Sequence, residues 1–445
     1  MKRIKFILPF LILTFSINNL FSLERVEFNK INFVKDSLPN GLKVIYSVDK
    51  SAPVVAVVVN YMVGSKDENP DRTGFAHFFE HLMFEASKNY ERASIDKFVD
   101  EAGGQLNAST GFDQTSYFIK VPSNEIKLPL WVESSRMRGL KVDTIGVETQ
   151  RGVVKEERKM RNDNTPYGTM LEKTVQHLFK GSSYAWTPIG SEQHIDKATI
   201  DEFRTFYDNF YQPNNAVLAI VGDIDIQETK KLVRDYFGNI PPAPTPKREP
   251  FKIAELKEGY REIVEDQKAQ LPAVFISYRA PSMLDNDIYA FELLNQILSR
   301  GESSRLYQRL VDKEQVAVQA ASNNLSFHKI GGVLFYGVAS PGKKIEDVEK
   351  LIYDEINKIV KNGITDEELT KAKNILEVEF IRDKKNVLKK AQDLSMTWQF
   401  LGNPDLVNTD LEKYLKVTKE DIQRVAKKYL DTDKKVVLIY VPKQS

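Results

Sequence analysis

The sequence predicts an α+β protein built from two like halves, and three observations support this fold class. A proline-rich stretch at 240–250 cuts the chain near its middle, and strand-like apolar runs at 54–61 and 273–278 open the two halves. A helix-then-strand pattern also recurs at the end of each half. The 445 residues exceed the usual size of one domain, so we expect two domains, each with its own sheet and helices.

The recurring pattern keeps a constant register. Thr199 and Thr418 lie 219 residues apart, each in an N-cap position with an acid three residues later, which is typical of a capping box. Apolar residues at helical spacing follow each threonine, and a strand-like run comes next, at 216–222 and at 435–441. Two such units can resemble each other by chance, but the shared register across cap, helix and strand favours duplication.

The domain boundaries follow from the prolines. Four prolines within 241–246 form neither helix nor central strand and behave as a semi-rigid spacer. We therefore predict a first domain at 30–238, a linker at 239–250 and a second domain at 251–445.

The first residues are typical of an export signal. Lys2, Arg3 and Lys5 precede an apolar run at 6–15, which is shorter than the roughly 20 residues of a membrane-spanning helix. We expect a signal peptide at 1–22 and a periplasmic mature protein, with a membrane anchor as the alternative. The chain has no Cys, so neither disulfides nor lipid attachment at a cysteine is expected.

The overall charge excludes some classes of partner. Lys and Arg number 63 and Asp and Glu number 62, so no global field attracts nucleic acid or anionic lipid. We expect no nucleic-acid partner and no stable membrane insertion after removal of the signal. Hydrophobic residues at 42% are enough for sizeable cores.

The five histidines are unevenly distributed, and two of them fall within the five residues 77–81. The segment is compatible with a helix, so His77 and His81 lie one turn apart on one face, with Glu80 on the same side. This is the zinc-helix motif His-Glu-x-x-His in reverse order. The remaining histidines, His177, His194 and His328, are scattered and are interpreted as structural.

A hydrolytic zinc site needs a third protein ligand and an open position for water. Glu157, 76 residues after His81 in another helix-compatible segment, is the strongest candidate. Glu80 then serves as general base towards the attacking water. Two histidines and a glutamate on an amphipathic helix can equally be a satisfied polar cluster, so the motif by itself leaves both interpretations open.

The flanking residues extend the pattern. The segments 74–84 and 151–157 resemble the two metal segments of the pitrilysin/insulinase family, inverted-motif zinc peptidases that include the mitochondrial processing peptidases. The resemblance implies one zinc per chain, held by His77, His81 and Glu157. It also implies two halves, each an antiparallel-dominated sheet packed with helices and clam-like when paired with a second subunit, with no metal site in the second half.

The segments 104–110 and 113–117 resemble the family's edge strand beside the zinc. This implies that Asn107 and Ala108 contact substrate backbone, which suits peptide capture by strand addition. The alternative for Asn107 is a simple turn.

The chain departs from the family pattern at three positions. Many relatives carry an acid where this chain has Gln150, so support of the third ligand differs. Val311 and Val318 stand where single-chain relatives and the non-zinc subunits of paired relatives place an Arg and a Tyr that grip the substrate. A shifted alignment would use one of the residues Arg305, Tyr307 or Arg309.

The resemblance therefore implies a zinc-bearing subunit that works with a homologous subunit lacking the motif and supplying Arg and Tyr, with a homodimer as the alternative. The expected activity is zinc-dependent endoproteolysis of unfolded peptides or extended protein segments. One other hypothesis is a non-catalytic scaffold or assembly subunit of the same fold. Another is a metal-dependent hydrolase with a non-peptide substrate.

Overall fold

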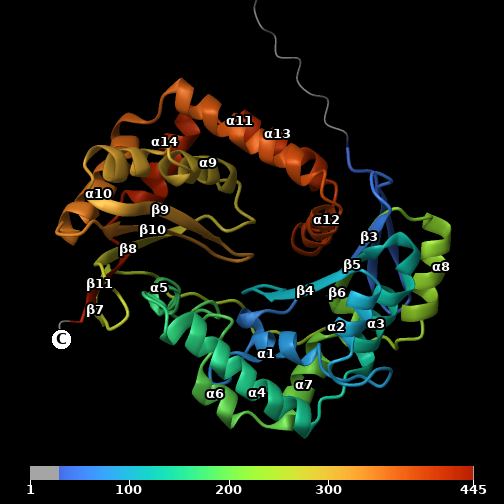
Figure 1. The fold of residues 1–445 in the computed structure, drawn as a ribbon. Helices are drawn as coiled ribbons and strands as arrows, with labels where there is room; N and C mark the ends of the chain where they lie inside the picture. Colours follow the sequence, from blue (N-terminus) through green and yellow to red (C-terminus); the bar gives the residue numbers. More distant parts are fainter. Residues whose placement is uncertain (1–29, 444–445) are drawn as a thin grey trace, which may run out of the picture. The chain divides into compact units, whose positions relative to one another are not determined.

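The computed structural model describes residues 30–443, and from Ile31 onward they form one compact unit (Figure 1). The predicted signal peptide at 1–22 lies outside the described residues. None of the helices within 30–443 is long and apolar enough to cross a membrane.

The first half contains one sheet and a set of helices. Its strands are β1 (Val34–Ser37), β2 (Lys43–Val48), β3 (Val54–Tyr61), β4 (Gln105–Thr110), β5 (Thr115–Pro122) and β6 (Ala216–Gly222). Its helices are α1 (Phe75–Leu82), α2 (Ile95–Glu101), α3 (Lys127–Gly139), α4 (Thr144–Arg158), the π-helix η3 (Lys159–Asp163), α5 (Met170–Leu178), α6 (Glu192–Lys197), α7 (Ile200–Phe210) and α8 (Ile226–Phe237).

The second half repeats this composition. Its strands are β7 (Tyr260–Asp266), β8 (Ala273–Ala280), β9 (Ala317–Ser326), β10 (Gly331–Ala339) and β11 (Val436–Pro442). Its helices are α9 (Ile288–Ser299), the π-helix η5 (Tyr307–Lys313), α10 (Ile345–Asn362), α11 (Asp366–Asp383), α12 (Val387–Leu401), α13 (Leu406–Lys416) and α14 (Lys419–Leu430). The predicted linker contains neither helix nor strand.

Apart from the additional edge strand β1 of the first sheet, the two sheets have the same topology. Within 30–443 the first sheet runs β1-β2-β6-β3-β5-β4 and the second runs β7-β11-β8-β10-β9. In each, one pair is parallel, β2 with β6 and β7 with β11, and the other pairs are antiparallel. The predicted fold class, two α+β halves with antiparallel-dominated sheets, is therefore confirmed, while the domain boundaries stay predictions.

The predicted helix caps are present. Thr199 at the N-cap of α7 accepts the amide of Glu202, and Thr418 at the N-cap of α14 accepts the amide of Asp421. The carboxylate of each acid accepts the amide of its threonine, so each pair forms the expected capping box. The strands that follow, β6 and β11, coincide with the predicted runs to within one residue.

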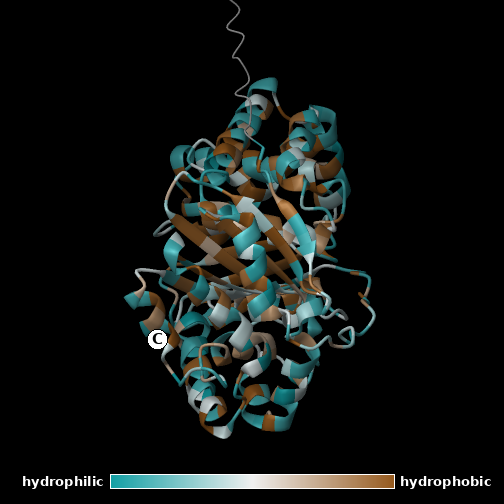
Figure 2. Cartoon of the chain, turned by 90° about the vertical axis from the view of Figure 1, so that its right-hand side faces the viewer, coloured by the Kyte–Doolittle hydropathy of each residue, from teal (hydrophilic) through white to brown (hydrophobic). Residues whose placement is uncertain are grey.

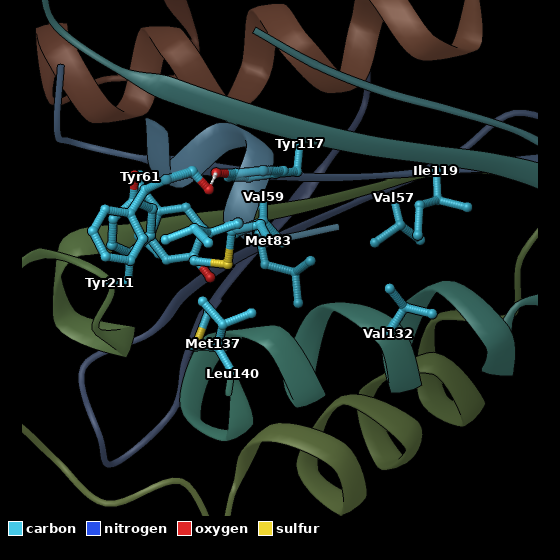
Figure 3. Close-up of a cluster of buried hydrophobic side chains, with 14 of the residues drawn as sticks. Val57, Val59, Tyr61, Met83, Tyr117, Ile119, Val132, Met137, Leu140 and Tyr211 are labelled. Carbon is cyan, nitrogen blue, oxygen red and sulfur yellow. Dashed lines mark hydrogen bonds between the residues drawn. The ribbon is translucent and has the colours of Figure 1, made fainter. Parts of the chain in front are cut away.

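The core of the first half lies between the sheet and helices α1, α3 and α7. Buried side chains of β3 and β5, among them Val57, Val59 and Tyr117, pack on Met83 and Met137 (Figure 3). Strand residues are mostly apolar and the surrounding helices alternate apolar and polar positions, as expected for amphipathic helices on a sheet (Figure 2). This packing gives α1 a rigid support.

One helix of each half packs on the sheet of the other half, an arrangement that we call the helix exchange. Helix α12 of the second half packs through Ala391 and Leu394 on the face of the first sheet that α1 does not cover, in a cluster with Val58 and Ala219. Helix α5 of the first half packs on the second sheet in the same way. Each sheet therefore has one face covered by its own half and the other face covered by the opposite half.

Candidate metal centre

The start of helix α1 is held by a glycine at the N-cap and by the carboxylate of Glu68, which lies six residues earlier. Gly74 adopts φ 98°, and a Cβ there would lie 2.9 Å from Ile195 Cδ1, so a glycine is required. The buried side chain of Glu68 accepts the amides of Gly74 at 2.9 Å and Ala76 at 2.8 Å. Because the first amides of a helix lack partners within the helix, Glu68 holds the start of α1 in place.

The apolar side of α1 is fixed by aromatic packing. Phe75 and Phe78 stack on Phe203 of α7 with ring centroids 4.6 and 4.5 Å apart. Among the residues that face away from this aromatic cluster, His77 is buried, whereas Glu80 and His81 are partly exposed. The helix therefore presents one buried and one accessible imidazole from a fixed support.

Helix α4, which carries Glu157, is held by three basic side chains. Arg151 donates to the Ala198 carbonyl at 3.0 Å, Lys155 pairs with residues of α6, and Arg158 donates to the Gly190 carbonyl at 2.6 Å. The segment 189–198 also approaches the start of α1, where the backbones of Gly190 and Gly74 are in contact. One segment therefore contacts both helices.

The structure brings His77, His81 and Glu157 together, with one ligand atom from each lying within 4.8 Å of the others. Glu157 Oε2 lies 3.0 Å from His81 Nε2 and 3.5 Å from His77 Nε2. The two imidazole rings are 4.9 Å apart at 82°. Ligand atoms about 2.1 Å from a tetrahedral zinc ion lie about 3.4 Å from each other, so this donor set fits zinc.

The protonation equilibria of these residues favour cation binding. Burial lowers the pKa of His77 to about 4, and the His81 ring contributes in the same direction. A hydrogen bond with His81 lowers the pKa of Glu157, against the opposing effect of burial. Neutral imidazole and ionised carboxylate are the forms that bind metal.

Glu80 lies on the same side of α1 as the cluster and contacts β4. Thr110 Oγ1 donates to Glu80 Oε2 at 2.5 Å. Burial raises the pKa of Glu80, and this hydrogen bond opposes the rise. A carboxylate whose pKa is raised is a stronger base than an exposed glutamate.

Asn107 and Ala108 lie on β4, at the edge of the first sheet, as the resemblance implied. The side chain of Asn107 is exposed, and its Oδ1 accepts the amide of Ala108 at 2.8 Å. β4 is bonded to β5 on one side, and Thr110 at its end reaches Glu80. The outer edge of this strand therefore lies close to the carboxylate of α1.

The residues that stand where relatives carry the substrate-gripping Arg and Tyr lie in the second half of the chain, whereas His77, His81 and Glu157 lie in the first. Val318 on β9 is exposed, and Val311 on η5 is partly buried. Of the residues in the shifted alignment, Arg305 pairs with Glu368 at 2.6 Å, and Arg309 pairs with its neighbour Glu314 at 3.1 Å. These two arginines are thus engaged within the half.

The other histidines make ordinary structural contacts. His177 stacks on Tyr260 with centroids 3.5 Å apart, and His194 Nδ1 lies 2.9 Å from Thr73 Oγ1. The His328 amide donates to Asp113, which also accepts from the Tyr184 hydroxyl, joining the turns of the two halves.

Sequence reasoning missed three residues of the site. Thr110 donates to Glu80, although the sequence indicates it only as part of a strand. Arg161 pairs with Glu157 Oε1 at 2.9 Å, and Glu68 holds the start of α1. An acid six residues before a helix-starting glycine matches no capping motif, so no local signal indicated Glu68. Arg161 lies four residues after Glu157, a helical spacing that could have indicated the pair.

Comparison with known proteins bears on these observations. A family model described as insulinase, peptidase family M16, matches residues 43–185, and the model of the peptidase M16 inactive domain matches residues 197–376. The chain belongs to the insulinase family, peptidase family M16. The resemblance inferred from the two metal segments is therefore confirmed.

Relatives of this M16 chain include bacterial proteases. It is 33% identical over 416 residues to the zinc protease PqqE of Helicobacter pylori, which covers 91% of each chain. A crystal structure of a protease from Helicobacter pylori matches with TM-score 0.88 and 30% identity, over 93% of this chain and all of that one.

Two more distant structures share the fold of this M16 chain. The peptidase M16 inactive domain from Pseudomonas fluorescens matches with TM-score 0.83 and 17% identity, over 93% of this chain and 99% of that one. The periplasmic protease PqqL from Escherichia coli matches with TM-score 0.77 and 18% identity, over 94% of this chain but 48% of PqqL. One chain of this length thus corresponds in fold to half of PqqL.

Proposed function

We propose that this chain is a zinc-dependent endopeptidase in which His77, His81 and Glu157 hold one zinc ion and Glu80 is the general base. The observation that carries the proposal is the convergence of Glu157 Oε2 on the two imidazole nitrogens, at 3.0 and 3.5 Å. When bound, zinc supplies Lewis-acid activation of a water and of the peptide carbonyl.

Glu80 handles the proton in this proposal. Its carboxylate takes a proton from the attacking water and then delivers it to the leaving amine. The raised pKa of Glu80 suits the first transfer, because it makes the carboxylate a stronger base than that of an exposed glutamate. Thr110 orients the carboxylate through its hydrogen bond.

The proposed substrate is an extended peptide that adds to the free edge of β4. The Ala108 amide is the donor for the incoming strand, so the Asn107 side chain that now accepts it must turn towards the peptide. Strand addition needs an extended chain, which favours unfolded peptides or extended segments over folded proteins.

A homologous partner subunit is part of the proposal. Val311 and Val318 donate no side-chain hydrogen bonds, and Arg305 and Arg309 are each paired with a glutamate of the same half. A subunit without the zinc motif would contribute the missing Arg and Tyr, with a homodimer as the competing assembly. The correspondence in fold to half of PqqL supports such pairing.

Location and domain division are proposed on the sequence. The basic and apolar residues at 1–22 support export to the periplasm. The proline-rich segment supports domains at 30–238 and 251–445 joined by a linker at 239–250.

The test combines metal analysis with peptidase assays. We expect one zinc per chain, little cleavage of an unfolded peptide by the chain alone, and strong cleavage once a motif-lacking homologue is added. Glu80→Gln should retain zinc and lower turnover about 10²- to 10⁴-fold, because only the proton acceptor is removed. Glu156→Gln, an exposed neighbour of a ligand, is the matched control.

Three outcomes would contradict parts of this proposal. Unchanged turnover in Glu80→Gln would reject the assigned base. Full activity of the lone chain would reject the need for a partner. Zinc binding without cleavage in any assembly would favour the alternative of a non-catalytic subunit.

A further inference from the structure

Besides the ligands themselves, a side-chain bridge joins α4 to the segment that follows α1. Gln150, on α4 seven residues before Glu157, donates from Nε2 to Glu85 Oε1 at 2.7 Å. Glu85 lies four residues after His81 and is 4% exposed. The hydrogen bond therefore connects a residue two helical turns before Glu157 on α4 to a residue just beyond the end of α1, four positions after His81.

The bridge has a second connection. The other oxygen of Glu85 accepts from Arg92, which in turn donates to Asp143 at 3.1 and 3.2 Å. Asp143 is the N-cap of α4 and accepts the amide of Gly146 at 2.8 Å. Glu85 is thus joined to α4 twice, directly at Gln150 and through Arg92 at the start of the helix.

The packing around this bridge is close. A Cβ on Gly146 would lie 2.8 Å from Arg92 Nη1 and 3.7 Å from Glu85 Cγ, so the absence of a side chain there lets the bridge approach α4. Gln150 Oε1 is buried and has no hydrogen-bond partner within residues 30–443. The donor group of the amide is therefore the part that this position uses.

A carboxylate at position 150 would repel Glu85, whereas the amide of Gln150 donates a hydrogen bond to it. A carboxylate at 150 would place two negative groups at hydrogen-bonding distance in a largely buried site, and Arg92 is already shared between Glu85 and Asp143. An amide donates to Glu85 without adding charge. The chain thus needs a donor at 150 because it has an acid at 85.

We propose that Gln150 is a positioning residue, which through Glu85 sets the distance between α4 and the end of α1 and so brings Glu157 onto His77 and His81. This inference rests on the proposed zinc site. Contacts outside the ligands matter because displacements of well under an ångström change how well a donor set fits its ion.

The test is a double-substitution cycle read out as zinc affinity of folded protein, by competition with a chelator. Gln150→Glu should weaken zinc binding about 10- to 100-fold, the range for contacts that support a ligand. Gln150→Glu combined with Glu85→Gln reverses donor and acceptor and should return the affinity close to that of the natural protein. Thr149→Glu, the same charge change at an exposed neighbour, should leave the affinity unchanged.

Circular dichroism confirms that each variant is folded, and Gln150→Met provides a variant without added charge, for which weaker zinc binding is again expected. Unchanged affinity in folded Gln150→Glu, or a folded double variant that stays as weak as the single one, would overturn the inference. The peptidase assay on the same samples separates the two proposals. Zinc binding without cleavage overturns the proposed function, while the affinities still decide the role of Gln150.

Discussion

The two halves place different chemistry at corresponding points of one fold. β3 begins at Val54 and β8 at Ala273, 219 residues later, which is the offset between Thr199 and Thr418. The same offset carries His77 to Gln296 and His81 to Arg300, on or just after α9. Helix α9 packs on α11 as α1 packs on α4.

The side chains at these two second-half positions form hydrogen bonds with helix α11. Gln296 donates to the Ala372 carbonyl at 3.1 Å, and Arg300 pairs with Glu379 of α11. A guanidinium carries its own positive charge and has no lone pair to offer a metal. In the first half, by contrast, two imidazoles and Glu157 Oε2 lie close together, while the other oxygen of Glu157 pairs with Arg161 of the segment that follows α4.

The helix pair is therefore a scaffold common to both halves, and the residue types that it carries decide its use. Both second helices carry an acid that faces the first helix, Glu157 on α4 and Glu379 on α11, although the 219-residue offset carries Glu157 to Leu376, three residues before Glu379. The residues on or just after the first helix determine whether this acid faces an arginine, as Glu379 does, or two imidazoles, as Glu157 does. Three predictions test this comparison.

The largest effect is expected on zinc binding, when His81 is replaced by the arginine that stands at the corresponding position, Arg300, in the second half. His81→Arg should pair with Glu157 and weaken zinc binding several hundred-fold, since structural zinc energies of about 10–16 kcal/mol are shared among four ligands. Zinc content after dialysis measures this. Arg300→Gln is the control and should leave zinc content unchanged, and zinc retained by His81→Arg would contradict the comparison.

The second effect concerns the free energy of unfolding, and it is expected for helices α12 and α5, which each cover the sheet of the other half. Leu394 of α12 and Leu178 of α5 are both fully buried against the opposite sheet. Leu394→Ala and Leu178→Ala should each lower the free energy of unfolding by about 2–5 kcal/mol, through lost burial and a cavity. Urea unfolding followed by circular dichroism should show one transition in both variants, and unfolding of a single half would contradict mutual dependence.

The smallest effect is expected at the ion pair of the second half. Arg300 is about half exposed, so its pairing with Glu379 is weakened by solvent. Arg300→Met should change the free energy of unfolding by less than about 1 kcal/mol. Thermal unfolding of the zinc-free protein measures this, and a loss of several kcal/mol would mean that the pair stabilises the half far more than its exposure suggests.

Local patterns in the sequence predicted much of the fold. The caps at Thr199 and Thr418, the strands that follow them and the helix around His77 each depend on residues close together in the chain. The convergence of Glu157 on the histidines was inferred through the resemblance, since no local pattern places residues 76 positions apart.

Long-range contacts were beyond such reasoning. The apolar positions of 387–401 predict a helix with a buried face, but periodicity does not say which sheet it covers. The hydrogen bonds from Gln150 to Glu85 and from the Gly74 amide to Glu68 depend on how helices and loops meet in three dimensions. Gln150 was recognised as a departure, and its donor role became apparent only from its partner.

The helix exchange has a consequence for synthesis on the ribosome. The first sheet is complete once Gly222 has been made, but its second face stays bare until α12, which ends at Leu401, has emerged. Nearly 180 further residues must be translated while valines such as Val58 and Val217 remain open to water. A nascent chain in this state calls for a holding chaperone, and a fragment ending at the proline-rich segment should aggregate rather than fold.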